Sequence, residues 1–248
     1  MSETASRTGP TALALRLVAE FAVIVLGVLV ALGVEGWFSD RQDADREVEL
    51  LQSLASDLRG SLAILEEDNS ATLSRVGTLD WFLRVPVDSG EAVPIDSLPS
   101  VSNAANVTAA YYPTLRTYET MIATGTFDLI TSEGVRRSLA DVKYESQIYN
   151  DYRAQATQQW NDTFSVTWLE FMGVHPLDGE FGPMTVPGAT SADAAGAALR
   201  DDFFRAVIDR RRIFLFFVAE NGQRLADTMR ATLDLITDEL DVRGARAE

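Results

Sequence analysis

The sequence predicts an all-α protein, in which an N-terminal transmembrane helix is followed by an antiparallel helical bundle with long helices. An uncharged apolar run of fourteen residues, 21–34, lies near the N-terminus. Beyond it, apolar residues recur at every third or fourth position over long stretches, which is the period of one helix face. No stretch alternates apolar and polar residues in the way that a half-buried strand would. These observations favour helices throughout.

Composition excludes several kinds of site. The formal net charge is −16, whereas nucleic-acid binding depends on a basic patch, so we expect no nucleic-acid partner. The chain has no cysteine and its one histidine is His175. Disulfides, thiolate metal sites and cysteine nucleophiles are therefore excluded, as is a metal site built from several histidines of one chain. We expect no metal and no cofactor.

The opening segment predicts a division into a short cytoplasmic tail at 1–16, a transmembrane helix at 17–38 and an exported helical domain at 39–248. A span needs roughly 20 apolar residues, and 17–38 suffices if Glu20 and Glu35 lie at the two interfaces. Trp37 then fits the aromatic belt on the far side. The two sides of the span carry similar numbers of Arg, so the short N-terminal tail and its α-amino group decide the expected orientation, with the N-terminus inside and the domain outside the cytoplasm.

Two alternatives to an uncleaved anchor remain open. The segment has the length of a signal-peptide core, and Ala31-Leu32-Gly33 is a small-x-small cleavage site. Against cleavage, Glu20 stands where a signal peptide prefers cations. A soluble core helix is the other alternative, but this run is apolar all round and has no polar stripe.

Four residues of this segment are candidates for contact with the membrane or a partner: Glu20, Gly27, Ala31 and Trp37. Gly27 and Ala31 form a small-xxx-small step, which lets two helices approach closely. Glu20 is an ionisable residue at the edge of the span, and such residues are often functional. Alternatively, it pairs with Arg16 four residues earlier or bonds to a neighbouring chain.

The rest of the chain predicts three long helices and one short helix. Residues 43–84 form the first long helix, on which Asn69 and Thr72 interrupt the apolar seam; it is either a bundle helix or half of a coiled coil. The region 85–112, whose 86–99 stretch holds three prolines, predicts a loop. The short helix begins at Pro113 and ends at Gly125. A second loop spans 174–191.

Two further long helices complete the predicted bundle. One is capped by Ser132 and runs from 133 to about 171; the other spans 192–241, with Asp201 and Asp202 near a helix start. The segment 213–219, IFLFFVA, is too short to cross a membrane and is expected in the core. The helix from 133 offers these core candidates: Val135, Leu139, Val142, Ile148, Tyr152, Trp160, Phe164 and Trp168.

Two stretches resemble a group of bacterial single-pass membrane proteins that are anchored at the N-terminus and have no established activity. The first is AEFAVIVLGVLVALGVEGW, in which Glu20, Gly27, Ala31-Leu32 and Trp37 occupy the signature positions. The second is residues 117–145, where matches occur at Tyr118, Gly125, Leu129, Ile130 and Arg136. The resemblance implies a bacterial inner membrane location, single-pass topology and a helical fold, and supplies no reaction.

Motifs for chemistry are absent: the sequence has no P-loop, no GxSxG and no HExxH. Arg210, Arg211 and Arg212 either bind an anionic ligand or lipid headgroup, or pair with acidic residues of the bundle. A group of aromatic residues either lines a pocket or packs in the core: Tyr111, Tyr112, Tyr149, Tyr152 and Trp160. Asp178 and Glu180 make only a weak calcium loop.

The sequence therefore favours a non-enzymatic, membrane-anchored interaction or scaffold protein. Its expected partners are the lipid bilayer and either a second copy of the chain or another membrane protein. The alternative is a ligand-sensing ectodomain that acts through a membrane partner. An exported hydrolase is the third hypothesis, weakened because the usual nucleophile and base sets are missing.

Overall fold

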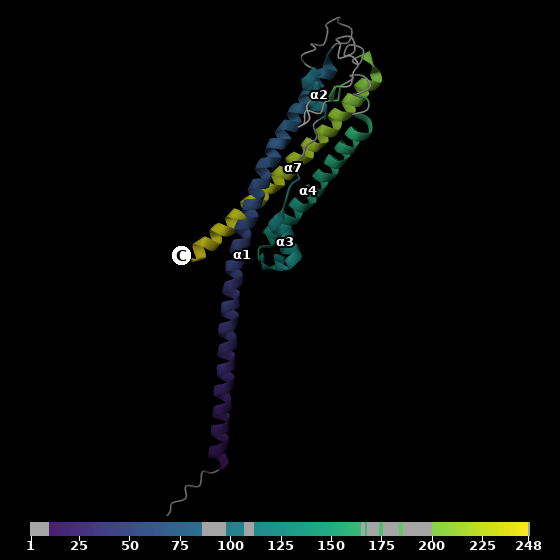
Figure 1. Ribbon diagram of the computed structural model, residues 1–248. Helices are drawn as coiled ribbons and strands as arrows, with labels where there is room; N and C mark the ends of the chain where they lie inside the picture. Colours follow the sequence, from purple (N-terminus) through teal and green to yellow (C-terminus); the bar gives the residue numbers. More distant parts are fainter. Residues whose placement is uncertain are drawn as a thin grey trace, which may run out of the picture. The chain divides into compact units, whose positions relative to one another are not determined.

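A computed structural model describes residues 10–85, 98–106, 112–164, 167, 174–175, 184–185 and 200–247 (Figure 1). The helices are α1 Pro10–Arg84, α2 Leu98–Asn106, α3 Arg116–Thr124, the 3-10 helix η2 Thr126–Leu129, α4 Glu133–Gln159, the π-helix η3 Trp160–Phe164 and α7 Asp202–Ala247. Two strands of two residues each, β1 Val174–His175 and β2 Met184–Thr185, pair antiparallel. The all-α prediction is confirmed.

The chain divides into two compact units, Met1–Leu50 and Leu51–Glu248. In the first unit, residues 10–50 belong to α1, and the apolar side chains of its membrane-like stretch are exposed, from Phe21 at 68% to Phe38 at 65%. This helix is long and apolar enough to cross a membrane, and none of its most apolar stretch is buried. The stretch is therefore not a core helix of this chain.

In the second unit, the part of α1 from Leu51 to Arg84 packs with α4 and α7 (Figure 1). Glu66 and Leu83 of α1 contact Arg230 and Arg205 of α7, so these two helices run in opposite directions. Likewise, Ser138 and Ala156 of α4 contact Thr232 and Arg211 of α7. The predicted helical bundle is therefore present, with α7 antiparallel to α1 and α4, which run parallel to each other.

The core lies where the predicted apolar seams meet. Buried members of these seams include Leu51, Ala55, Leu58, Leu65 and Leu79 of α1, Val135, Leu139 and Val142 of α4, and Leu225, Met229 and Ile236 of α7. Ile148, Tyr152 and Trp160 are half-buried. The side chains of Phe164 and Trp168 lie outside the described residues. Helical periodicity therefore located most of the core.

The prediction that 213–219 is core was half wrong. Leu215, Val218 and Ala219 are buried, but Phe216 and Phe217 are 46% and 39% exposed. An α-helix turns about 100° per residue, so a continuous apolar run of seven residues must direct some side chains away from one buried face. The two phenylalanines contact each other, with ring centroids 6.0 Å apart.

Helix α2 is a correction to the predicted loop at 85–112. Its buried residues Val101, Ala104 and Ala105 join a cluster with Leu79 and Phe82 of α1. A helix of nine residues is marginal in isolation, so tertiary packing stabilises it. The small residues and nearby prolines gave no helical signal in the sequence.

The predicted helix ends are largely confirmed. Gly125 has φ 72°, the left-handed conformation that ends α3. The side chain of Ser132 accepts a hydrogen bond from the backbone N–H of Val135, and Asp201 accepts one from Phe204 at 2.8 Å. Helix α3 begins at Arg116, three residues after Pro113.

The ends of the other two long helices differ from their predicted bounds. α4 stops at Gln159 and gives way to the π-helix η3, whereas the prediction ran to about residue 171. The stretch 168–173 lies outside the described residues, as does 186–199, where the second loop ends and the last helix was expected to begin. α7 is unbroken from Asp202 to Ala247. β1 and β2 lie in the predicted loop 174–191.

Candidate functional site

The four predicted contact residues of the membrane-like segment all lie on α1. At 100° per residue, Glu20, Gly27 and Ala31 fall on one stripe of the helix, while Trp37 lies about 100° around from them. All four are exposed within the chain. A β-carbon built on Gly27 meets no atom within 4 Å outside its own helical turn. Glu20, Gly27 and Ala31 therefore form one face with small residues at its centre.

A polar layer crosses the bundle where the α1 seam was predicted to be interrupted. Asn69 and Thr72 are 6% and 1% exposed, so they lie inside the core. The hydroxyl of Tyr149 on α4 donates to Asp68 at 3.2 Å. On α7, Gly222 leaves room for Asn69, because a β-carbon there would lie 2.8 Å from its Oδ1 atom. The polar residues that interrupt the α1 seam therefore lie at the contact between α1, α4 and α7.

Arg211 is the largest fully buried side chain among the described residues. Its Nε donates to the carbonyl of Ala105 at 2.8 Å, and its Nη1 donates to the carbonyl of Ala156 at 2.7 Å. Both carbonyls lie in the last turn of a helix, α2 or α4, where the helix dipole favours cations, although the carbonyl of Ala156 also accepts from the backbone N–H of Trp160. Burial and the positive charge of Arg75 lower the pKa of Arg211 to about 9. The guanidinium is charged at neutral pH and joins two helix ends.

The aromatic residues considered for a pocket make separate contacts. Tyr149 is buried in the polar layer, while the Tyr112 ring lies 3.7 Å from the guanidinium carbon of Arg153. The indole N–H of Trp160 donates to Asn106 at 2.9 Å. The ring of Tyr152 makes a tilted contact with that of Phe217, and Tyr111 lies outside the described residues. None of these described aromatic residues lines the pocket below.

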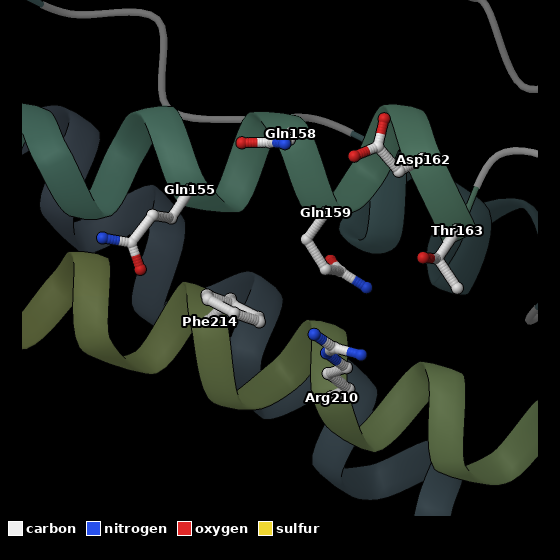
Figure 2. Close-up of a pocket in the computed structure, with 7 residues that line it drawn as sticks. All are labelled: Gln155, Gln158, Gln159, Asp162, Thr163, Arg210 and Phe214. Carbon is white, nitrogen blue, oxygen red and sulfur yellow. The ribbon is translucent and has the colours of Figure 1, made fainter.

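A pocket of about 220 Å³ opens between the end of α4, the π-helix η3 and α7 (Figure 2). Seven residues line it: Gln155, Gln158, Gln159, Asp162, Thr163, Arg210 and Phe214. The π-helix supplies Asp162 and Thr163. Single π-turns within helices are frequent at functional sites, because the extra residue per turn changes the direction of nearby side chains.

Gln159 and Arg210 face each other across this pocket (Figure 2). Gln159 is only 6% exposed, yet neither Oε1 nor Nε2 of its amide has a hydrogen-bond partner among the described residues. Arg210 is exposed, and no carboxylate of the described chain lies within 4.0 Å of its guanidinium nitrogens. Its guanidinium carbon lies 5.8 Å from the Phe214 ring centroid. The pocket thus holds a guanidinium that makes no ion pair within the described chain and an amide without a hydrogen-bond partner there.

The arginine triplet of the sequence is divided among three environments. Arg210 lines the pocket, Arg211 binds helix-end carbonyls, and Arg212 pairs with Asp209 at 2.7 Å. The two hypotheses for the triplet therefore apply to different residues. Arg212 pairs with an acidic residue of the bundle, whereas Arg210 lines a cavity that could hold an anionic ligand. Consecutive residues diverge because each step turns the helix by about 100°.

Sequence reasoning missed Gln159. The buried face of α4 follows Val135, Leu139, Val142, Ser146, Tyr149, Arg153 and Ala156, and the next step of three is Gln159. A glutamine at a buried register position was the available signal, because buried polar side chains need partners. Among the described residues, no group of three or more His, Cys, Asp or Glu side chains is arranged to hold a metal ion. Asp178 and Glu180 lie outside them.

No family model, curated protein or solved structure matches this chain.

Proposed function

We propose that this protein is a membrane-anchored, non-enzymatic interaction protein. Residues 17–38 span the bacterial inner membrane, the tail 1–16 lies in the cytoplasm, and the domain 39–248 lies outside it. The observation that carries the proposal is the run of exposed apolar side chains on α1, of which Leu29 and Val30 are 60% and 58% exposed. Exposing apolar surface to water costs a free energy of roughly 25 cal/mol for each Å², so this stretch is more stable inside a bilayer.

The stripe of Glu20, Gly27 and Ala31 is the proposed partner face within the membrane. Small residues let a second helix approach until backbones make van der Waals contact. A carboxylate at the membrane edge adds a polar group that a partner helix can bind. The partner is a second copy of the chain or another membrane protein.

Extraction of the full-length protein from native membranes in a mild detergent tests this proposal. Intact mass and identification of co-purifying proteins are the readouts. We expect an uncleaved chain with a stoichiometric partner, and loss of that partner in Gly27→Leu. Val25→Leu is the matched control, because position 25 lies about 140° from Glu20 on the helix. A lone monomer, or a chain cut after Gly33, would contradict the proposal.

A second candidate function is ligand sensing, in which the domain acts through a membrane partner. The pocket at Gln159 and Arg210 favours it, because unsatisfied polar groups around a cavity are typical of ligand sites. The partner's recovery should then change when the pocket is filled. Unchanged recovery with a filled pocket would exclude sensing.

A further inference from the structure

We infer that the pocket between α4, η3 and α7 binds a small hydroxycarboxylate. The ligand's carboxylate accepts hydrogen bonds from Arg210 and from the amide N–H of Gln159, and its hydroxyl donates to the amide oxygen of Gln159. This inference names the ligand class of the sensing function and rests on that function for its biological role. It does not depend on the membrane anchor or on the partner.

Gln159 points to a ligand that both accepts and donates. An amide has an N–H donor group and a carbonyl acceptor, and burying either without a partner costs free energy. In Gln159 both are buried and unpartnered within the described chain. In Figure 2 this side chain extends from α4 toward α7 and the pocket. A carboxylate oxygen satisfies Nε2, and a neighbouring hydroxyl satisfies Oε1.

Arg210 specifies the charge of the ligand. A guanidinium presents N–H groups in a fork that matches a carboxylate, and such charge-assisted bonds are about twice as strong as neutral ones. In Figure 2 Arg210 rises from α7 opposite Gln159, while Asp162 lies on the opposite edge of the α4–η3 ribbon. The chain as a whole carries −16, so its field disfavours multiply charged anions and favours a single carboxylate. A nearby guanidinium likewise favours a hydroxyl over an ammonium as the donor.

The volume of the pocket limits the size of the ligand, and the remaining lining residues determine where its apolar part can lie. The volume of about 220 Å³ exceeds the cavity of about 150 Å³ that holds benzene, so a ligand a little larger than benzene fits. The Phe214 ring, half-buried beside Arg210, provides an apolar wall for the hydrocarbon part. Thr163 adds a hydroxyl at the π-helical side.

Isothermal titration calorimetry on the purified full-length chain in detergent tests the inference, with α-hydroxyisocaproate as the probe. We expect saturable binding with a dissociation constant on the order of 1 mM or lower. Isocaproate, which lacks the hydroxyl, should bind at least about tenfold more weakly. α-Hydroxyisocaproamide, which lacks the negative charge, should also bind at least about tenfold more weakly. Leucine, with an ammonium in place of the hydroxyl, should also bind more weakly. No heat of binding for the hydroxycarboxylate would overturn the inference.

Two variants assign the binding to these residues. Arg210→Gln should weaken binding at least about tenfold, whereas the neighbouring Arg212→Gln, whose side chain pairs with Asp209, should bind like the parent. Gln159→Leu should lose binding while its melting temperature stays equal or rises, because an unsatisfied buried amide is replaced by an apolar group. A lower melting temperature in Gln159→Leu with binding intact would show a structural amide and overturn the assignment.

These measurements separate the inference from the proposed function. They use the isolated chain, so binding that persists while no partner co-purifies would contradict the interaction function and leave the site standing. If the ligand does not bind while a stoichiometric partner is recovered, the proposed site is contradicted and the interaction function stands.

Discussion

Gly222 on α7 lies so close to Asn69 on α1 that a β-carbon at position 222 would be 2.8 Å from the Oδ1 atom of Asn69. The same β-carbon would lie 3.2 Å from the Tyr149 ring on α4. Real β-carbons essentially never lie within 3.0 Å of another non-bonded atom, so any side chain at position 222 would require the buried Asn69 side chain or its neighbours to shift. The polar layer depends on this contact.

Gly222→Ala should therefore destabilise the bundle by about 1–3 kcal/mol, because the added methyl would press against the buried side chains of Asn69 and Tyr149. The measurement is the free energy of unfolding by urea, followed by circular dichroism. Gly60→Ala is the matched control, since a β-carbon at position 60 meets nothing within 4 Å. That control should gain about 0.5–1 kcal/mol from helix propensity. Equal gains at both positions would disprove the close approach.

Arg211→Ala should lower the free energy of unfolding by about 2–4 kcal/mol. The change removes the guanidinium N–H groups that donate to the carbonyls of Ala105 and Ala156. Ala156 keeps the N–H of Trp160 as a partner. The neighbouring Arg212→Ala should cost less than about 1 kcal/mol, since its ion pair with Asp209 is partly exposed. Urea unfolding of both variants measures the difference. A similar loss in both would mean that the buried guanidinium has no special structural role.

Asp57→Ala should weaken the start of α3. The Oδ2 atom of Asp57 accepts from the backbone N–H of Thr117 at 2.8 Å and from its hydroxyl at 2.7 Å. Loss of a helix N-terminal acceptor costs about 0.5–2 kcal/mol. Hydrogen exchange at the amides of α3 should accelerate in this variant. The exposed neighbour Ser56→Ala is the control, and faster exchange there too would show that α3 is sensitive to any change in this turn.

Val30→Arg should impair membrane insertion. An arginine at the centre of a span costs about 2.5–3.5 kcal/mol on the insertion scale. Glu35→Arg places the same residue near the predicted interface, where its long side chain can reach the headgroups, so it should insert nearly normally. The fraction of protein that resists alkaline extraction from membranes is the readout. Equal extraction of both variants would contradict a span centred on this stretch.

The local features of this protein were predictable from its sequence. Helical periodicity located the seams at Leu51, Leu58 and Leu65, because a single chain segment fixes which residues share a helix face. The ends at Gly125 and Ser132 followed from backbone conformation and capping, which also act within a few residues. The apolar stretch of α1 needed only composition and length.

Contacts between distant segments required the tertiary structure. Helix α2 forms because Val101 and Ala105 pack against α1 and α7, and nothing in its own residues predicts that. The division of the arginine triplet depends on which neighbouring helices each side chain meets. The pocket lies where Gln159 at the end of α4 and Thr163 of the π-helix come beside Arg210 of α7, which is fifty-one residues away from Gln159 in the sequence. Long-range packing, which no local pattern encodes, decided these features.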